Sequence, residues 1–186
     1  MKGKRYIQQL SFLRTAHAHG RLHHAYILHG ATRDAMRDFV YEFAAYLQCQ
    51  EKKDDIACGA CFACRSFVLN KIPFMAHVVT DKEGTIKIDA IREAKHSLIL
   101  SCDPSVYKLL MIINADLMTD EAREVLLKTL EEPPQRTIIF LTAEVRSLMS
   151  QTVISRCQSI YVSASDTILS SDILDTRVRE LTTLVS

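Results

Sequence analysis

The stretch YKLLMIINAD, residues 107–116, decides the fold class of this chain. Its centre, LLMII at residues 109–113, is apolar without interruption. A strand with one exposed face alternates apolar and polar side chains, whereas a central strand of a parallel sheet is buried on both faces. We therefore predict a central strand in a sheet that helices cover on both sides.

Outward from this strand, short apolar runs alternate with amphipathic segments along the sequence. Further strands are predicted within residues 24–30, 75–81, 136–144 and 157–162. Helices are predicted within residues 6–20, 33–49, 62–72, 87–100, 120–132 and 147–156. Because parallel strands that alternate with helices are joined by right-handed crossovers, this order predicts an α/β fold with a mostly parallel central sheet flanked by helices.

The length and composition favour one full domain and a remainder. The chain has 186 residues, 48% of them apolar, which is enough to bury a core. We predict one domain over residues 1–162. The segment 163–186 is rich in Ser, Thr and Asp and marks the start of a second, incomplete domain, with a candidate helix at 172–185.

The charge balance limits the partners of the chain. The formal net charge is +1, so no global basic field favours nucleic acid, and contact with DNA would have to be local or shared with other subunits. No apolar run approaches the ~20 residues of a membrane helix, and the N-terminus lacks the apolar core of a signal peptide. We expect a soluble, cytoplasmic protein without a membrane partner.

A cysteine cluster occupies about residues 49–64, with the spacing C-x8-C-x2-C-x2-C. Its members are Cys49, Cys58, Cys61 and Cys64. Four thiolates can close a tetrahedral shell around a structural Zn²⁺, and Gly59 suits the tight turn that this requires. The alternative is four reduced cysteines without a metal. Cys102 and Cys157 stand alone and are interpreted as small apolar residues.

The segment YILHGATRDAMRDFV, residues 26–40, lies where a nucleotide-binding protein would hold phosphate. A phosphate loop has the pattern G-x-x-x-x-G-K-[ST], in which the Lys and the hydroxyl contact phosphate and Mg²⁺. Counted from Gly30, the later positions are Ala35, Met36 and Arg37. The residues alone therefore favour an ordinary strand-turn-helix junction, and ATP is not expected to bind productively.

The second ATPase signature is also missing. A Walker-B strand ends in an acidic pair that organises Mg²⁺ and activates water. Here Ile113 and Asn114 hold those positions. Asp116 could take either role only after a shift of register that keeps the same face of the strand.

Several motifs resemble, in order and approximate distance, those of bacterial clamp-loader subunits of the AAA+ family. The resemblance spans residues 4–162 and rests on HHAYILHG, the cysteine spacing, IDAIREAKHSL, LLKTLEEPP, IIFLTAE and ISRC. In that family the gamma/tau subunit carries an intact phosphate loop and acidic pair, whereas delta-prime has lost catalytic residues. With Met36, Ile113 and Asn114 at these positions, the sequence resembles the delta-prime branch.

The resemblance implies a role for Arg156, which matches the arginine of the family's SRC motif. That residue reaches the ATP of a neighbouring subunit as an arginine finger, where a planar guanidinium stabilises charge on the γ-phosphate. The implied protein is a non-hydrolysing clamp-loader subunit with gamma/tau and delta as partners, acting on the sliding clamp and primed DNA. The implied second domain is a lid that starts near residue 163. The alternative for Arg156 is a salt-bridged surface arginine that caps a short helix.

Other positions are less decisive. The family's polar γ-phosphate sensor would fall on Ala143, beside Thr142. A basic helical stripe of Arg92, Lys95 and His96 could face DNA or only solvent. Two further function classes stay open: an active gamma/tau-like ATPase with a divergent phosphate loop, and a stand-alone zinc module that binds nucleic acid. The near-zero net charge disfavours the zinc module.

Overall fold

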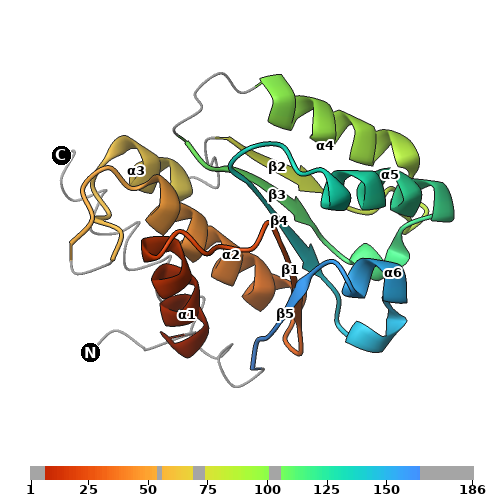
Figure 1. Ribbon diagram of the computed structural model, residues 1–186, viewed down its shortest axis with the longest axis horizontal. Helices are drawn as coiled ribbons and strands as arrows, with labels where there is room; N and C mark the ends of the chain where they lie inside the picture. Colours follow the sequence, from red (N-terminus) through yellow and green to blue (C-terminus); the bar gives the residue numbers. More distant parts are fainter. Residues whose placement is uncertain (1–6, 54–55, 69–73, 101–105, 164–186) are drawn as a thin grey trace.

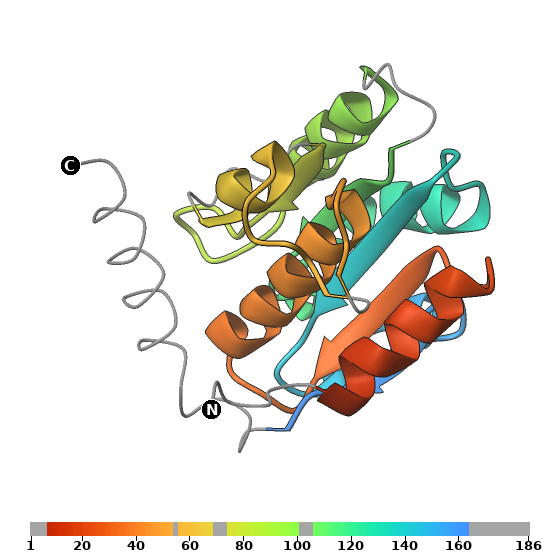
Figure 2. The same cartoon turned by 90° about the vertical axis from the view of Figure 1, so that its left-hand side faces the viewer.

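The protein forms one parallel sheet between two layers of helices (Figures 1 and 2). The computed structural model describes residues 7–53, 56–68, 74–100 and 106–163. The strands are β1 (Ala25–His29), β2 (Met75–Val78), β3 (Lys108–Ile112), β4 (Thr137–Thr142) and β5 (Gln158–Tyr161). The helices are α1 (Ile7–Ala18), α2 (Arg33–Gln48), α3 (Phe62–Val68), α4 (Ile88–Leu100), α5 (Asp120–Glu131) and α6 (Gln151–Ile154), with 3₁₀ turns η1 (Ala115–Leu117) and η2 (Arg146–Leu148).

The strand order is β2-β3-β4-β1-β5, and every pairing is parallel. All amino ends of the strands therefore lie at one edge of the sheet and all carboxyl ends at the other. The predicted α/β class and all five predicted strands are confirmed.

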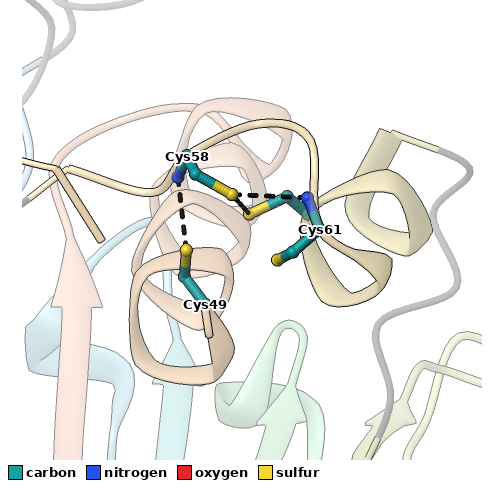
Figure 3. Close-up of side chains that lie close together, drawn as sticks. Cys49, Cys58 and Cys61 are labelled. Atoms are coloured by element: carbon teal, nitrogen blue, oxygen red, sulfur yellow. Dashed lines mark hydrogen bonds between the residues drawn. The ribbon is translucent and has the colours of Figure 1, made fainter. Parts of the chain in front are cut away.

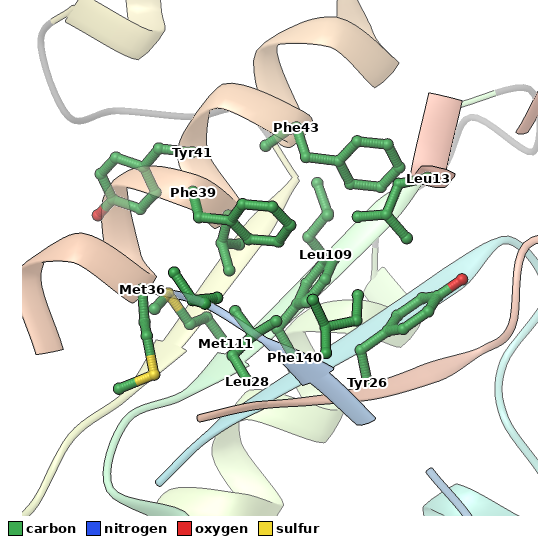
Figure 4. Packing of buried hydrophobic residues seen from close by; sticks show 14 of the residues in the cluster. Leu13, Tyr26, Leu28, Met36, Phe39, Tyr41, Phe43, Leu109, Met111 and Phe140 are labelled. Carbon is green, nitrogen blue, oxygen red and sulfur yellow. The ribbon is translucent and has the colours of Figure 1, made fainter. Parts of the chain in front are cut away.

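The central strand buries both of its faces, as the sequence predicts. Leu109 and Met111 belong to the core cluster that α1 and α2 cover, whereas Leu110 and Ile112 belong to the cluster under α4, α5 and α6. Figure 4 shows the first cluster, in which aromatic side chains of α2 pack against the sheet. Successive side chains of a strand point to opposite faces, so an uninterrupted apolar run fits only a strand with a core on each side.

Hydroxyl caps fix where two helices begin. The side chain of Thr32 accepts a hydrogen bond from the N–H of Ala35 at the start of α2, and Thr119 does the same for Ala122 at the start of α5. Each cap satisfies a backbone donor that has no partner inside the helix. At the other end of α5, Pro133 and Pro134 follow the cap residue and cannot continue the helix.

The helix predicted over residues 147–156 is interrupted, so that prediction was wrong in part. Met149 and Ser150 separate η2 from α6, and the Ser150 hydroxyl accepts from the N–H of Val153. A serine that caps a new helix turn ends the preceding one. The turn η1 was not predicted, and the candidate helix at 172–185 lies outside the described residues.

Candidate functional site at the two ends of the sheet

The carboxyl end of β1 lacks the loop that would hold phosphate. Only Gly30, Ala31 and Thr32 separate β1 from α2. The residues of a phosphate loop must stay outside the helix so that their N–H groups face the ligand. Here the positions from Arg33 onward are already helical, and the N–H of Met36 donates to the carbonyl of Thr32 at 3.0 Å.

Met36, a residue of α2, is fully buried, with 0% of its surface exposed. It belongs to the core cluster between α2 and the sheet that Figure 4 shows. The next residue, Arg37, carries a charge but forms ion pairs with Asp34 at 3.0 Å and with Asp38 at 3.2 Å. The position of the phosphate-binding lysine is therefore part of the core, and the neighbouring cation is paired within its own helix.

A tyrosine covers the start of this junction. Gly30 has φ +97°, and a Cβ there would lie 2.3 Å from Cε2 of Tyr161 and 2.9 Å from the carbonyl oxygen of Val162. His29 meets the same tyrosine ring edge-on, at 5.6 Å between ring centroids. The end of β5 thus lies directly against the first glycine, a contact that the sequence analysis missed.

The end of β3 carries no acidic pair. The strand stops at Ile112, Ile113 is buried, and Asn114 turns the chain with φ 57°. Asp116 lies in η1, beyond the paired strand, and the register of β3 with β4 is fixed from Lys108 to Ile112. The shift of register that would bring Asp116 into the role of the acidic pair is therefore excluded.

The sensor region is tied to this same turn. The N–H of Asn114 donates to the Thr142 hydroxyl at 3.1 Å, and both Thr142 and Ala143 are fully buried. The hydroxyl beside the expected sensor position is thus used inside the chain. Within the described residues, one side-chain oxygen of Asn114 and one of Asp116 are buried without a hydrogen-bond partner.

Arg156 lies at the opposite edge of the sheet. It precedes β5 by two residues, and the first residue of β5, Gln158, pairs with Tyr26 near the amino end of β1. Its side chain is 36% exposed. The guanidinium donates to one carboxylate oxygen, Oε1 of Glu131, from Nε at 3.1 Å and from Nη2 at 2.7 Å.

The same guanidinium also caps α6. Its Nη1 donates to the carbonyl of Thr152 at 2.9 Å and to the hydroxyl of Ser155 at 3.4 Å. The salt bridge and helix cap expected under the surface-arginine alternative are therefore both present. An arginine finger must also be held in place and be partly exposed to reach a neighbouring molecule. The geometry therefore fits both the surface-arginine role and the arginine-finger role. The pairing of Arg156 with Glu131 was not predicted from the sequence.

The four cysteines of the predicted metal site come together next to α2 and α3. Figure 3 shows Cys49, Cys58 and Cys61 of this cluster. All four sulfur atoms lie within 4.8 Å of one another. Backbone N–H groups point at two of them: Cys58 donates to the sulfur of Cys49 at 3.2 Å, and Cys61 donates to the sulfur of Cys58 at 3.3 Å. Gly59, with φ +77°, makes the turn between them. The cluster could hold a metal ion.

The surroundings favour thiolates at two of these positions. Hydrogen bonds from the N–H groups of Ala60 and Cys61 lower the pKa of Cys58. Burial alone would raise the pKa of Cys61, but hydrogen bonds from neighbouring backbone and thiol groups outweigh it and lower the pKa to about 6. Burial raises the pKa of Cys64. Thiolates are the form that binds Zn²⁺, and a sulfur of raised pKa loses its proton when the metal arrives.

Two further predictions concern Arg92 of the basic helical stripe and the lone cysteines. Arg92 is exposed and pairs with Asp89 at 3.6 Å, on the same helix. Burial raises the pKa of the Cys157 thiol to about 12, in keeping with a small apolar residue, whereas Cys102 lies outside the described residues. In the part of the chain that the structure describes, no helix is long and apolar enough to cross a membrane.

The parallel sheet, with the strand order β2-β3-β4-β1-β5, and its two helix layers define a three-layer α/β domain. The fold is similar to a DNA polymerase III gamma subunit-related protein from Thermotoga maritima, with a TM-score of 0.60, 22% identity and coverage of 83% of this chain and 46% of that one. It also resembles a RuvB variant from the same organism, with a TM-score of 0.50, 15% identity and coverage of 84% and 43%. The chain belongs to the family described as DNA polymerase III, delta subunit, whose model matches residues 6–166.

Curated relatives agree with this family. The chain is 31% identical over 153 residues to the DNA polymerase III subunit delta' of Yersinia pestis, covering 81% of this chain and 45% of the relative. It is 31% identical over 144 residues to the same subunit of Escherichia coli K12, covering 77% and 43%. A tau subunit from Bacillus subtilis is 28% identical over 135 residues, covering 73% and 24%. The chain thus spans less than half the length of these relatives and is a clamp-loader relative of the delta-prime kind.

Proposed function

We propose that this chain is a non-hydrolysing clamp-loader subunit that supplies Arg156 to the ATP site of a neighbouring subunit. One observation carries the proposal: an arginine is retained and held at the amino edge of the sheet, while the position of a phosphate-binding lysine at the carboxyl edge is a buried methionine. In an ATPase ring with sites between subunits, these two edges would serve different sites.

The proposed chemistry of Arg156 needs no nucleotide on its own chain. A guanidinium is planar and always charged, and it can donate to two phosphate oxygens at once. It would stabilise the charge that spreads over the γ-phosphate as the bond to the leaving group breaks, an effect worth ~10³ to 10⁵ in rate for known arginine fingers. The neighbouring subunit would contribute the loop, the Mg²⁺ ligands and the attacking water.

The carboxyl edge supports the proposed absence of hydrolysis by this chain itself. Met36 has no charge to offer, Arg37 is paired with two aspartates, and Tyr161 covers Gly30. The N–H of Asn114 already donates to the hydroxyl of Thr142, which is fully buried. A triphosphate would therefore meet apolar side chains and occupied donors where it needs free N–H groups and a lysine.

We also propose that the cysteine cluster holds a structural Zn²⁺. Its ligands would be Cys49, Cys58, Cys61 and Cys64, a set of four sulfurs that leaves no coordination position for water. The bound ion would cross-link the end of α2 to α3 and to the loop before it, and so stabilise the fold. Zinc content measured by mass spectrometry of the native protein tests this, and an ion count near zero would contradict it.

The remaining proposals follow the family. Gamma/tau and delta subunits would be the partners of this chain, and the sliding clamp and primed DNA would be reached through the assembled complex. Residues 163–186 would begin a lid domain after the domain that ends near residue 162.

The decisive experiment replaces Arg156 in a reconstituted clamp loader. With Arg156→Ala, we expect hydrolysis at the neighbouring site to slow by ~10³ or more, measured as DNA-stimulated ATP turnover. Arg92→Ala removes a positive charge that is also exposed and ion-paired, and should leave turnover near the wild-type value. Unchanged turnover with Arg156→Ala would remove the arginine from the mechanism.

The second candidate is an active ATPase with a divergent phosphate loop. It is favoured by the 28% identity to a tau subunit and the 25% identity over 147 residues to the tau subunit of Escherichia coli K12. Calorimetric titration of the isolated chain with Mg·ATP separates the two candidates. We expect no binding in the micromolar range, and tight binding with turnover would favour the second.

A further inference from the structure

Arg156 and Glu131 come from separate parts of the fold and meet at the amino edge of the sheet. Glu131 is the last residue of α5, and 25 residues separate it from Arg156 in the sequence. A single oxygen, Oε1, accepts from both Nε and Nη2, so the carboxylate contacts one side of the guanidinium fork. Hydrogen bonds in which both partners are charged are the strong ones, and two on one oxygen restrict the plane of the group.

The rest of the guanidinium is held almost completely. A guanidinium has five N–H donors. Two of them point at Glu131, and the two on Nη1 point at the carbonyl of Thr152 and the hydroxyl of Ser155. Among the described residues, the second N–H of Nη2 has no such acceptor. The side chain is thus placed in one orientation while a donor and part of its surface remain available.

Glu131 is itself anchored. Two other residues of α5, Leu126 and Leu130, are buried in the core under the sheet, and the N–H of Glu132 closes the helix on the carbonyl of Lys128. The last turn of a helix carries partial negative charge, which adds to the attraction of the carboxylate for a cation. The backbone of Glu131 is therefore fixed in the last turn of α5, and its side chain, which is 51% exposed, pairs with Arg156 from there.

We propose that Glu131 is a positioning residue for Arg156. The inference rests on the proposed function, since it concerns how the arginine is presented to the neighbour's phosphate. A free arginine side chain samples many rotamers, and an arginine that must find its orientation at every encounter stabilises the transition state less than one that is already oriented. Glu131 and the end of α6 would hold the guanidinium in that orientation before the neighbour's ATP is in reach.

The proposal predicts a specific kinetic change. Glu131→Ala leaves the charge on Arg156 but removes two of its four hydrogen bonds, so kcat of the assembled loader should fall by about 10- to 100-fold. KM for ATP should stay near its wild-type value, because the neighbouring subunit binds the nucleotide. Glu131→Gln keeps a neutral acceptor oxygen and should lie between alanine and wild type.

The experiment compares five variants in the reconstituted loader: Glu131→Ala, Glu131→Gln, Glu132→Gln, Arg156→Ala and the double Glu131→Ala/Arg156→Ala. Glu132 is adjacent and exposed, and its carboxylate makes no hydrogen bond or ion pair among the described residues, so Glu132→Gln is the matched control and should behave as wild type. On the isolated chain, the ¹⁵N-detected Nε–H signal of Arg156 should lose its protection from solvent exchange in Glu131→Ala only. Thermal unfolding of each variant checks that the fold persists.

The outcomes separate this inference from the proposed function. If Arg156→Ala slows turnover while Glu131→Ala does not, the positioning role is wrong and the arginine finger stands. If the double variant is slower than Arg156→Ala by the full factor of Glu131→Ala, the glutamate acts without the arginine and the inference is again wrong. If Arg156→Ala has no effect, both proposals fall. Support requires a double variant no slower than Arg156→Ala.

Discussion

The two edges of the sheet have opposite characters. At the carboxyl end of β1, Met36 is buried and Gly30 lies against the ring of Tyr161. Helix α2 begins at Arg33, where the backbone of a phosphate loop would still be outside a helix. At the amino end of β5, Arg156 is partly exposed and held by four hydrogen bonds. Under the proposed function, an ATP site shared between subunits consists of two halves that a chain can keep or lose separately.

The first prediction concerns Arg156, which under the proposed function is the half of the ATP site that this chain keeps. Arg156→Lys keeps the positive charge but not the planar fork, so it should slow DNA-stimulated ATP turnover of the assembled loader by ~10³, close to the effect of alanine. A lysine ammonium cannot reproduce the paired contacts to Glu131 and to phosphate. Wild-type turnover with Arg156→Lys would show that charge alone suffices at this edge. Arg92→Lys is the matched control.

A single substitution at Met36 should not restore nucleotide binding at the carboxyl edge. Met36→Lys places an ammonium group in a fully buried position, which should lower the free energy of unfolding by about 3 kcal/mol or more because the amine must be desolvated or lose its proton. Denaturant unfolding measures this loss, and titration with Mg·ATP should still detect no binding. A stable variant that binds ATP would show instead that the carboxyl edge is a nucleotide site that lacks only its lysine.

A glycine substitution measures how tightly the carboxyl edge is closed. Gly30→Ala should lower the free energy of unfolding by about 2 kcal/mol, because φ is positive and the new Cβ would contact Tyr161 and the Val162 carbonyl. Gly20→Ala is the control, since Gly20 also has positive φ but nothing lies within 4 Å of its added Cβ; it should cost about 1 kcal/mol. Equal losses for the two variants would contradict the close contact.

The cysteine cluster lies at neither of the two compared edges of the sheet, so its response to pH can be measured independently of them. The pKa of Cys61 is lowered to about 6, so this thiol is already ionised at neutral pH. Only in more acidic solution does it carry a proton that a binding metal ion must displace. Below about pH 6, affinity for Zn²⁺ should therefore fall by roughly a further tenfold for each pH unit. Competition with a chromophoric chelator between pH 7.5 and 5 measures it.

Cys61→Ser should remove this additional pH dependence. A pH profile with the same slope above and below pH 6 would contradict the lowered pKa of this thiol. Neither result should change how the loader responds to Arg156→Ala at neutral pH.

The fold could be predicted because its signals are local. The run LLMII is apolar on both faces, and each predicted strand is bounded by turn residues, so strand positions needed no knowledge of distant neighbours. The break between η2 and α6 was missed because Ser150 serves equally well inside an exposed segment and as a cap. The choice between these is made by how the chain packs onto the sheet.

The candidate site was predictable only in part, for the same reason. The cysteine spacing predicted a cluster that the structure brings together, and the absent lysine at Met36 is visible in the sequence. The pairs Gly30–Tyr161 and Glu131–Arg156 are not, because they depend on which strands are neighbours. Once β1 is known to pair with β5, the register of His29 with Tyr161 makes the first of these contacts evident.

The strand order also has a consequence for synthesis. Among the strands of this sheet, β1 leaves the ribosome first, whereas its neighbours β4 and β5 leave last, over a hundred residues later. The backbone N–H and C=O groups of β1 stay unpaired until nearly the whole domain has been synthesised. Such long-range pairing makes folding slow and exposes the nascent strand to non-native pairing. A nascent chain halted before Gln158 would still lack one neighbour of β1, and such an intermediate is where a chaperone would be expected to bind.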